Sequence, residues 1–211
     1  MPGFGEYLGM CCGVCRIFCY TLCRKLCCKP PPVPKQEYPL ICLGLSKAGK
    51  TTLLALLCGE KADDVQPTQG FNIKALSFKE AVLNVKEIGG NENVRKFWDR
   101  YYDGTEGVVF VLDSSCSDED LQIVVLELHK VLGHAELKGL PLLVLASYQD
   151  QSNARNVAQL IKDLQLEEKA VGRKWLVHPC SFTDVESARA GFQRMIYFLK
   201  GIEIKEGEGR I

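Results

Sequence analysis

An eight-residue segment near position 50 restricts the fold of this 211-residue chain more than any other feature. Residues 44–51 read GLSKAGKT, which matches the pattern G-x4-G-K-[ST] of a phosphate-binding loop. Such a loop follows a buried strand and opens a helix; here the apolar residues 38–44 predict the strand and residues 50–58 predict the helix. Its glycines let backbone N–H groups approach phosphate oxygens, and the helix dipole favours an anion at the same place. The sequence therefore predicts a protein that binds phosphate groups.

The residues expected around the phosphates are consecutive in the sequence. Lys50 is expected to reach the β- and γ-phosphates of a nucleotide, and the Thr51 hydroxyl is expected to bind Mg²⁺. The expected nucleotide-binding residues of this segment are Gly44, Leu45, Ser46, Lys47, Ala48, Gly49, Lys50, Thr51 and Thr52. A chance match to the pattern is expected in fewer than about 1% of chains of this length, given average shares of the residue types involved.

Strand-like segments recur along the rest of the chain. Alternating residues at 72–78 and 82–88 predict a hairpin. The almost wholly apolar runs at 107–113 and 140–146 predict central strands that are covered on both faces.

Helical segments alternate with these strands. Apolar residues recur at helical spacing in three of them, at 121–132, 157–164 and 188–199. Helix caps are expected from Ser117 with Asp120 and from Thr183 with Glu186. The alternation predicts an α/β fold with a mostly parallel sheet and helices on both faces.

Composition separates a short N-terminal segment from a globular domain. Hydrophobic residues make up 46% of the chain, enough for a buried core and too many for a disordered protein. The 26 basic and 26 acidic residues balance, which counts against a nucleic-acid binder with a wholly positive surface. Four prolines between positions 30 and 34 predict a stiff spacer. We expect a Cys-rich amphipathic membrane-anchoring tail with a proline hinge at 1–34, a nucleotide-binding domain at 35–201 and a short flexible tail at 202–211.

Seven of the eleven cysteines fall between positions 11 and 28, and five of them recur every four residues. The seven are Cys11, Cys12, Cys15, Cys19, Cys23, Cys27 and Cys28. On a helix this spacing forms one stripe, and the apolar and basic side chains between the cysteines suit a helix at a membrane surface that carries reversible S-palmitoylation.

Other interpretations of the cysteine-rich segment remain open. A zinc site lacks the usual spacing in its second pair of ligands. An unmodified apolar or protein-binding helix is a further possibility. We expect no signal peptide and no membrane-spanning segment, so a disulfide framework is disfavoured in the expected cytosolic setting.

Two motifs follow the phosphate-binding loop. Residues 67–72 read PTQGFN, and residues 87–91 read EIGGN, followed by Arg95, Trp98 and Tyr101. In these motifs the chain resembles the Arf and Arf-like small GTPases, over about residues 38–200. The corresponding family patterns are P-T-x-G-F-N and D-x-G-G-Q followed by R-x-x-W-x-x-Y. The resemblance implies a Ras-like P-loop GTPase fold, in which the mostly parallel sheet has six strands. It also implies GTP or GDP with Mg²⁺ as ligands, and a membrane-attached switch.

The resemblance also implies roles for residues in the two switch segments. Thr68 would bind Mg²⁺ and respond to the γ-phosphate, and the Gly90 N–H would contact that phosphate. Glu87 stands where the family has a magnesium-binding aspartate, and its longer side chain suits an ion bound through water but can displace it. Asn91 stands where the family has a glutamine that orients the attacking water. Because catalysis of this kind depends on positioning, we expect weak GTP hydrolysis.

The family's base-reading motif N-K-x-D appears here as Ser147, Tyr148, Gln149 and Asp150. Asp150 keeps the carboxylate that accepts hydrogen bonds from guanine N1 and N2, which preserves base choice. Ser147 cannot make all the contacts of the family asparagine, and the Tyr148 ring is expected to stack on the base where the family has a lysine. Ser181 matches the last guanine-binding loop, although Phe182 replaces a small residue there.

The leading hypothesis is a GTP-binding switch that is attached to membranes through an acylated N-terminus and hydrolyses GTP slowly. The alternative is a non-cycling module that binds partners independently of nucleotide, and it is favoured by the changes at Asn91, Ser147 and Tyr148. An ATP-using phosphotransferase is disfavoured by Asp150 and Thr68. We expect a monomer that binds effector and regulatory proteins and no nucleic acid. The expected location is the cytoplasmic face of a Golgi, endosomal or plasma membrane, with a cytosolic pool.

Overall fold

The computed structural model describes residues 15–18, 20, 22, 34–62 and 65–202. The chain divides into two compact units, Met1–Lys35 and Gln36–Ile211. In the first unit, residues 15–18, 20 and 22 are helical and exposed. No helix among the described residues is long and apolar enough to span a membrane.

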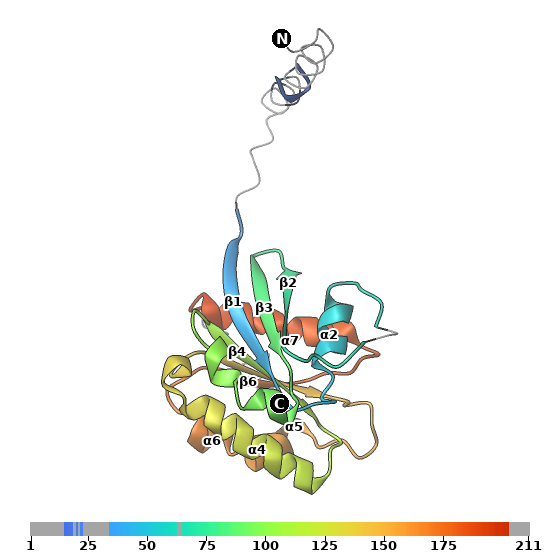
Figure 1. The fold of residues 1–211 in the computed structure, drawn as a ribbon, viewed down its shortest axis with the longest axis vertical. Helices are drawn as coiled ribbons and strands as arrows, with labels where there is room; N and C mark the ends of the chain where they lie inside the picture. The colour runs from blue at the N-terminus through green and yellow to red at the C-terminus, as the bar shows by residue number, and fades with distance from the viewer. Residues whose placement is uncertain (1–14, 19, 21, 23–33, 63–64, 203–211) are drawn as a thin grey trace. The chain divides into compact units, whose positions relative to one another are not determined.

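The second unit is built on a sheet of six strands among the described residues, in the order β2-β3-β1-β4-β5-β6 (Figure 1). The strands are β1 (Gln36–Leu43), β2 (Phe71–Ser77), β3 (Ala81–Ile88), β4 (Gly107–Asp113), β5 (Leu142–Ser147) and β6 (Trp175–Pro179). β2 pairs antiparallel with β3, and the other neighbouring strands pair in parallel. The predicted hairpin and the mostly parallel sheet are therefore confirmed.

Helices cover both faces of the sheet, as the alternating sequence predicts. They are α2 (Lys50–Leu57), α3 (Glu92–Arg95), α4 (Asp118–Gly133), α5 (Val157–Asp163), α6 (Leu166–Lys169) and α7 (Val185–Leu199), with short 3₁₀ turns η1 (Trp98–Tyr101) and η2 (Ala135–Leu137). One core contains residues of α4, α5 and α6, and the other contains residues of α2 and α7. In β4, Val108 and Phe110 enter the first core while Val109 and Val111 enter the second, which explains why the whole strand is apolar.

The helix caps agree with the sequence at α4 and differ at α7. The Ser117 hydroxyl accepts a hydrogen bond from the Asp120 N–H at the start of α4, as predicted. The cap predicted from Thr183 and Glu186 is wrong, because Asp184 caps α7 by accepting from the Ser187 N–H. The Thr183 hydroxyl instead lies 2.9 Å from the Ser181 hydroxyl. Thr183 is therefore engaged in the preceding loop, and the helix begins after Asp184.

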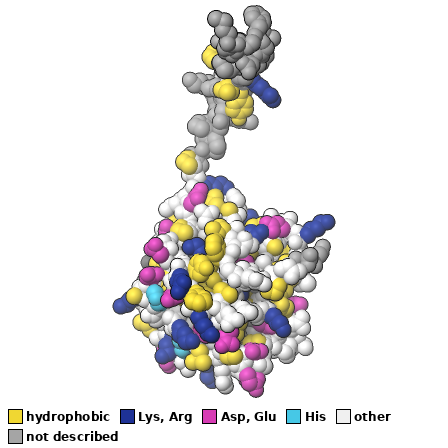
Figure 2. All heavy atoms as spheres, viewed as in Figure 1, with side chains coloured by type: hydrophobic (Ala, Val, Ile, Leu, Met, Phe, Trp, Pro, Cys, Tyr) yellow, Lys and Arg dark blue, Asp and Glu magenta, His cyan; other side chains and the backbone are white. Residues whose placement is uncertain are grey.

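The parallel strands end at one edge of the sheet, where the loops that follow them meet. The loop at 44–49 follows β1, residues 89–91 follow β3, residues 148–156 follow β5 and residues 180–184 follow β6. Crevices outside the carboxyl ends of parallel strands are the usual ligand sites of such sheets. On the face drawn in Figure 2, basic and acidic side chains are interspersed, with hydrophobic side chains near the middle.

Candidate functional site

The phosphate-loop motif forms the connection between β1 and α2. Gly49 caps the helix with a φ of 83°, which lies in the left-handed region that favours glycine. The Lys50 side chain is buried, and its Nζ donates hydrogen bonds to the carbonyl oxygens of Gly44 at 2.8 Å and Leu45 at 2.9 Å. Burial lowers the pKa of Lys50, and the neighbouring Glu87 carboxylate partly offsets this effect. A phosphate group beside Lys50 would stabilise its charged form.

A cavity of about 850 Å³ lies over the phosphate loop, which is within the usual size range of small-molecule sites. The site residues expected from the sequence that line it are Ser46, Lys47, Gly49, Lys50, Thr51, Thr52, Thr68, Glu87, Gly90, Asn91 and Tyr148. Those that lie outside its lining are Gly44, Leu45, Ala48, Ser147, Gln149, Asp150 and Ser181. The cavity therefore joins the phosphate loop to both switch segments, and the base-reading residues meet it through Tyr148.

Three oxygen-bearing side chains meet on the floor of the cavity. The Thr51 hydroxyl donates to Glu87 Oε1, and it lies 3.2 Å from the Thr68 hydroxyl. The Thr68 hydroxyl in turn lies 3.4 Å from Glu87 Oε1. Glu87 is fully buried, and its Oε2 has no hydrogen-bond partner among the described residues.

This oxygen cluster fits a hard divalent cation. An unpaired buried carboxylate oxygen is costly, and Mg²⁺ prefers oxygen ligands from carboxylates and hydroxyls. Thr51, Thr68 and Glu87 would hold the ion. A bound ion there would neutralise charge on nucleotide phosphates.

The second switch segment contacts the phosphate loop directly. The Ser46 N–H donates to the Gly90 carbonyl oxygen at 3.2 Å. A Cβ at Gly90 would lie only 2.3 Å from the Gly44 carbonyl oxygen, so the close approach requires glycine. The Trp98 indole is buried and donates to the Gly89 carbonyl oxygen at 2.9 Å. Trp98 therefore holds the backbone of this segment in place through a buried hydrogen bond.

Asn91 is engaged in a helix cap. It lies at the N-cap of α3, and its Oδ1 accepts a hydrogen bond from the Asn93 N–H at 3.0 Å. Asparagine is among the residues that favour this position, because its short side chain reaches the free N–H groups of the first turn. The amide of Asn91 thus lines the cavity while its oxygen is held by the helix.

Ser147 ties three parts of the fold together. Its hydroxyl lies 2.9 Å from the carbonyl oxygen of Ala48 in the phosphate loop and 2.8 Å from that of Leu112 in β4. The residue is fully buried. Through these contacts Ser147 holds the phosphate loop against the sheet. Because a hydroxyl has a single proton and both neighbours are acceptors, no proton is left for a hydrogen bond to a nucleotide base.

Two aromatic rings border the phosphate loop on the base-reading side. The Tyr148 hydroxyl donates to the Lys47 carbonyl oxygen at 3.4 Å, and its ring meets the Phe182 ring edge-on at 4.8 Å. The Phe182 ring also lies over Gly49, where a Cβ would come within 2.2 Å of it. Tyr148 adopts a φ of 58°, a strained conformation for a residue with a side chain. Burial, with Asp113 and Asp150, raises the pKa of Tyr148.

The remaining base-reading residues are held by the loops around them. The Gln149 side chain donates to the Ser114 hydroxyl at 2.7 Å and to the Arg155 carbonyl oxygen at 2.9 Å. Asp150 is exposed. The Ser181 hydroxyl accepts from the Asp184 N–H at 3.1 Å and thereby shapes the loop after β6.

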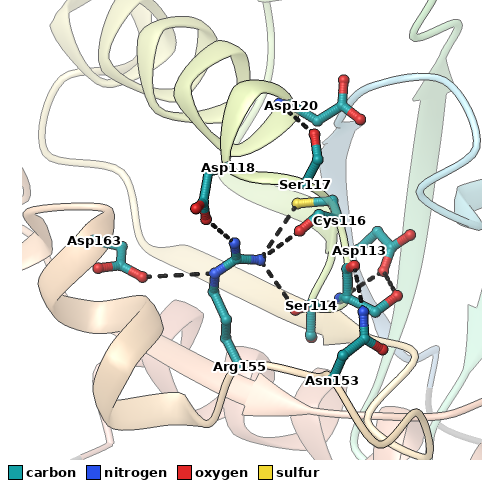
Figure 3. Close-up of polar contacts among 10 residues, drawn as sticks. Asp113, Ser114, Cys116, Ser117, Asp118, Asp120, Asn153, Arg155 and Asp163 are labelled. Atoms are coloured by element: carbon teal, nitrogen blue, oxygen red, sulfur yellow. Dashed lines mark hydrogen bonds and ion pairs between the residues drawn. The ribbon is translucent and has the colours of Figure 1, made fainter.

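Arg155 joins the base-reading loop to the start of α4, a role that the sequence analysis missed (Figure 3). Its Nη1 donates to the Cys116 carbonyl oxygen at 2.6 Å, and its Nη2 pairs with Asp118. Its Nε lies 3.9 Å from Asp163 on α5. No local sequence signal marks this residue, because the loop that it holds is 39 positions away in the chain.

The tail cysteines are described only in part. Cys15 is a free, exposed thiol on the helical residues 15–18. The other candidate lipidation sites lie outside the described residues, namely Cys11, Cys12, Cys19, Cys23, Cys27 and Cys28. Cys42 and Cys180, in contrast, are buried in the sheet domain, and burial raises the pKa of the Cys180 thiol to about 12.

Comparison with known protein families shows to which family the chain belongs. A sequence model of the ADP-ribosylation factor family matches residues 25–199. The chain belongs to this family. The resemblance inferred from the motifs at 67–72 and 87–91 is therefore confirmed, and the match includes the phosphate loop and the complete sheet.

Individual ADP-ribosylation factor relatives match over most of their length. ADP-ribosylation factor-like protein 15 from Bos taurus is 48% identical over 178 residues, covering 84% of this chain and 88% of the relative. Its counterpart from Mus musculus is 49% identical over 175 residues, covering 83% of this chain and 86% of the relative. ADP-ribosylation factor K from Dictyostelium discoideum is 38% identical over 161 residues, covering 75% and 83% respectively.

A solved structure has the same fold. It is the Arl6 BBS3 small GTPase from Trypanosoma brucei, determined with a bound nucleotide analogue, GppNp. The TM-score is 0.71 at 24% identity, covering 80% of this chain and 100% of that chain. The chain is thus an Arf-like small GTPase with the Ras-like fold, in a family of GTP-binding switches.

Proposed function

We propose that this Arf-family protein is a guanine-nucleotide switch that binds Mg²⁺, hydrolyses GTP slowly and attaches to membranes through an acylated N-terminal tail. One observation supports the proposal of a switch. Both switch segments contact the phosphate loop, through Thr68 beside Thr51 and through Gly90 beside Ser46. Contacts of this kind can order two loops when a γ-phosphate is present and release them after its loss.

Slow hydrolysis is supported by the position of Asn91. Its amide oxygen is held in the cap of α3, and the side chain is short for a group that must reach a water beside the γ-phosphate. Misplacement of a positioning group by about 1 Å can cost about 100-fold in rate. The same engagement of Asn91, together with that of Ser147, favours the second candidate function, a module that binds partners independently of nucleotide.

A substitution at Asp150 tests whether the protein recognises guanine. Replacing Asp150 with asparagine is expected to weaken GTP binding to the full-length chain by about tenfold to 100-fold, because hydrogen bonds to a charged group contribute about 1.5–3 kcal/mol. Xanthine has a carbonyl where guanine has its 2-amino group, so XTP binding is expected to improve. Titration calorimetry of GTP, XTP and ATP with Mg²⁺ measures these affinities.

The control for this experiment is Asp103→Asn, the same change at an exposed turn residue outside the cavity. It is expected to leave GTP binding unaltered. Preference of the unmodified protein for ATP would contradict the proposal, and absence of any nucleotide binding would favour the nucleotide-independent module.

Membrane attachment is proposed from the tail residues. Four of the described tail residues expose large apolar side chains near the exposed thiol of Cys15, namely Ile17, Phe18, Tyr20 and Leu22. A helix with apolar and basic side chains binds the membrane surface weakly, and one acyl chain adds only marginal affinity. Two or more acyl chains hold a protein firmly, so several acylated cysteines would fix this domain at the cytoplasmic face of a Golgi, endosomal or plasma membrane.

Replacing the seven tail cysteines with serine is expected to move the protein from the membrane fraction to the cytosol, because the acyl anchors are lost. Hydroxylamine, which cleaves thioesters, is expected to release the unmodified protein in the same way. Fractionation and an acyl-exchange assay measure both effects. The matched control is Cys58→Ser, a change at an exposed cysteine outside the tail. Membrane association that survives the seven changes would refute acylation.

Partner binding is proposed for the exposed apolar side chains near the switch segments. Phe71 and Ile73 on β2 and Phe97 before η1 are exposed, and the Phe71 ring lies 5.5 Å from the Tyr101 ring. Apolar side chains exposed together are typical of protein interaction sites. Effector and regulatory proteins are therefore expected to contact this region, and we expect the protein itself to be monomeric.

A further inference from the structure

We propose that Glu87 binds the nucleotide-associated magnesium ion directly, as a third protein ligand beside Thr51 and Thr68. This inference rests on the proposed binding of a guanine nucleotide with Mg²⁺. It differs from the sequence expectation, in which the carboxylate acts through a water molecule, and it predicts a lower number of waters on the ion.

The spacing of the three oxygens supports direct binding. Mg²⁺ holds its ligands at 2.0–2.1 Å in a near-ideal octahedron, so neighbouring ligand oxygens lie about 3 Å apart. The Thr51 and Thr68 hydroxyls are 3.2 Å apart, and the Thr68 hydroxyl is 3.4 Å from Glu87 Oε1. Thr51 also contacts Glu87 Oε1. Two of the three separations are therefore close to those between neighbouring ligands of a magnesium ion, and the Thr51–Glu87 hydrogen bond brings the carboxylate to the same point.

The length of the glutamate side chain makes this arrangement possible. Glu87 is fixed by the sheet, since it pairs with Cys42 on β1 and with Asn72 on β2. From that position its carboxylate reaches the same two hydroxyls that would hold the ion. An aspartate at this position would end about 1.5 Å further back, one carbon–carbon bond shorter. That gap leaves room for a water between the carboxylate and the ion.

The burial of the Glu87 carboxylate also supports direct binding to the metal ion. The carboxylate is fully buried, and Oε2 has no hydrogen-bond partner among the described residues. The Lys50 ammonium interacts electrostatically with this carboxylate, but its Nζ donates its hydrogen bonds to the carbonyl oxygens of Gly44 and Leu45. A buried ionised carboxylate is stable only when it is paired or coordinates a metal.

The test counts the waters bound to the metal. The full-length chain is loaded with GppNp and Mn²⁺, and electron paramagnetic resonance in ¹⁷O-enriched water gives the number of water ligands. Three protein oxygens and one oxygen each from the β- and γ-phosphates leave one of six positions for water. One water is expected in the unmodified protein. Two waters are expected in Glu87→Asp, because the retracted carboxylate admits a second.

Two further variants separate ligation from general damage. Glu87→Gln keeps the length and removes the charge, and we expect it to weaken Mn²⁺ binding to the GppNp complex by at least tenfold. Glu92→Asp makes the same shortening at an exposed residue of α3 and is expected to keep one water. If Glu87→Asp does not fold, the count in the unmodified protein and the affinity of Glu87→Gln still decide the question.

Each outcome has a distinct meaning. Two waters on the ion in the unmodified protein, or equal counts in it and Glu87→Asp, would overturn direct ligation while leaving the guanine-nucleotide switch intact. Failure of the unmodified protein to bind GppNp at all would instead reject the proposed function. One water in the unmodified protein and two in Glu87→Asp would establish Glu87 as a direct ligand.

Discussion

Replacing Lys50 with methionine is expected to abolish measurable binding of GTP and GDP. The Lys50 ammonium is buried at the base of the cavity, held by the carbonyl oxygens of Gly44 and Leu45. A phosphate that displaces those carbonyls gains charge-assisted hydrogen bonds worth about 1.5–3 kcal/mol each. Loss of two such contacts weakens binding by at least about 100-fold. Calorimetric titration with either nucleotide and Mg²⁺ measures the change.

The methionine variant should remain folded, because it fills nearly the same volume and removes a charge that is costly to bury. Thermal unfolding without nucleotide tests this directly. Lys79→Met, in the exposed turn between β2 and β3, is the matched control and should bind GTP normally. A Lys50→Met protein that retains nucleotide affinity would show that the phosphates lie elsewhere, and the assignment of this cavity would be wrong.

The parts of the fold that the sequence predicts well are those in which burial acts on consecutive residues. The run at 107–113 is apolar throughout because β4 contributes side chains to both cores. The phosphate loop is recognisable because its chemistry needs glycine, lysine and threonine at fixed spacing. In both cases the information lies within a few residues, and a sequence pattern carries it.

The parts that the sequence does not predict depend on partners far away in the chain. Ser147 reaches Ala48, 99 positions earlier, and thereby becomes a brace for the phosphate loop. Arg155 is held by backbone carbonyls near the start of α4, and a carbonyl oxygen leaves no signature in a sequence. The cap of α7 differs for a local reason instead: the Thr183 hydroxyl lies 2.9 Å from the Ser181 hydroxyl in the preceding loop, and Asp184 caps the helix.

Phe182 shows how one departure is accommodated by another. Its bulk raises doubt about the last guanine-binding loop when the sequence is considered alone. In the structure the ring packs over Gly49 and meets Tyr148, the residue that replaces the family lysine. The two aromatic residues therefore support each other next to the phosphate loop, and neither substitution can be judged without the other.

Replacing Asn91 with glutamine is expected to raise the rate of intrinsic GTP hydrolysis by about 100-fold. The added methylene moves the amide by about 1 Å, a distance that changes a positioning-dependent rate by that factor. Glutamine is also a poor N-cap, so its amide is free of the bond that Asn91 makes to the Asn93 N–H. Single-turnover release of phosphate from the full-length chain loaded with GTP and Mg²⁺ measures the rate.

The explanation through the helix cap has its own test. Asn91→Ala removes both the amide and the cap, so it reports whether the wild-type amide assists hydrolysis at all. Because that amide is held by α3, we expect the rates of Asn91→Ala and the unmodified protein to agree within about twofold. Asn84→Gln, the same lengthening at a β3 residue whose amide bonds Glu37, should change nothing. A large loss of rate in Asn91→Ala would show that Asn91 already positions the water, and slow hydrolysis would then need another cause.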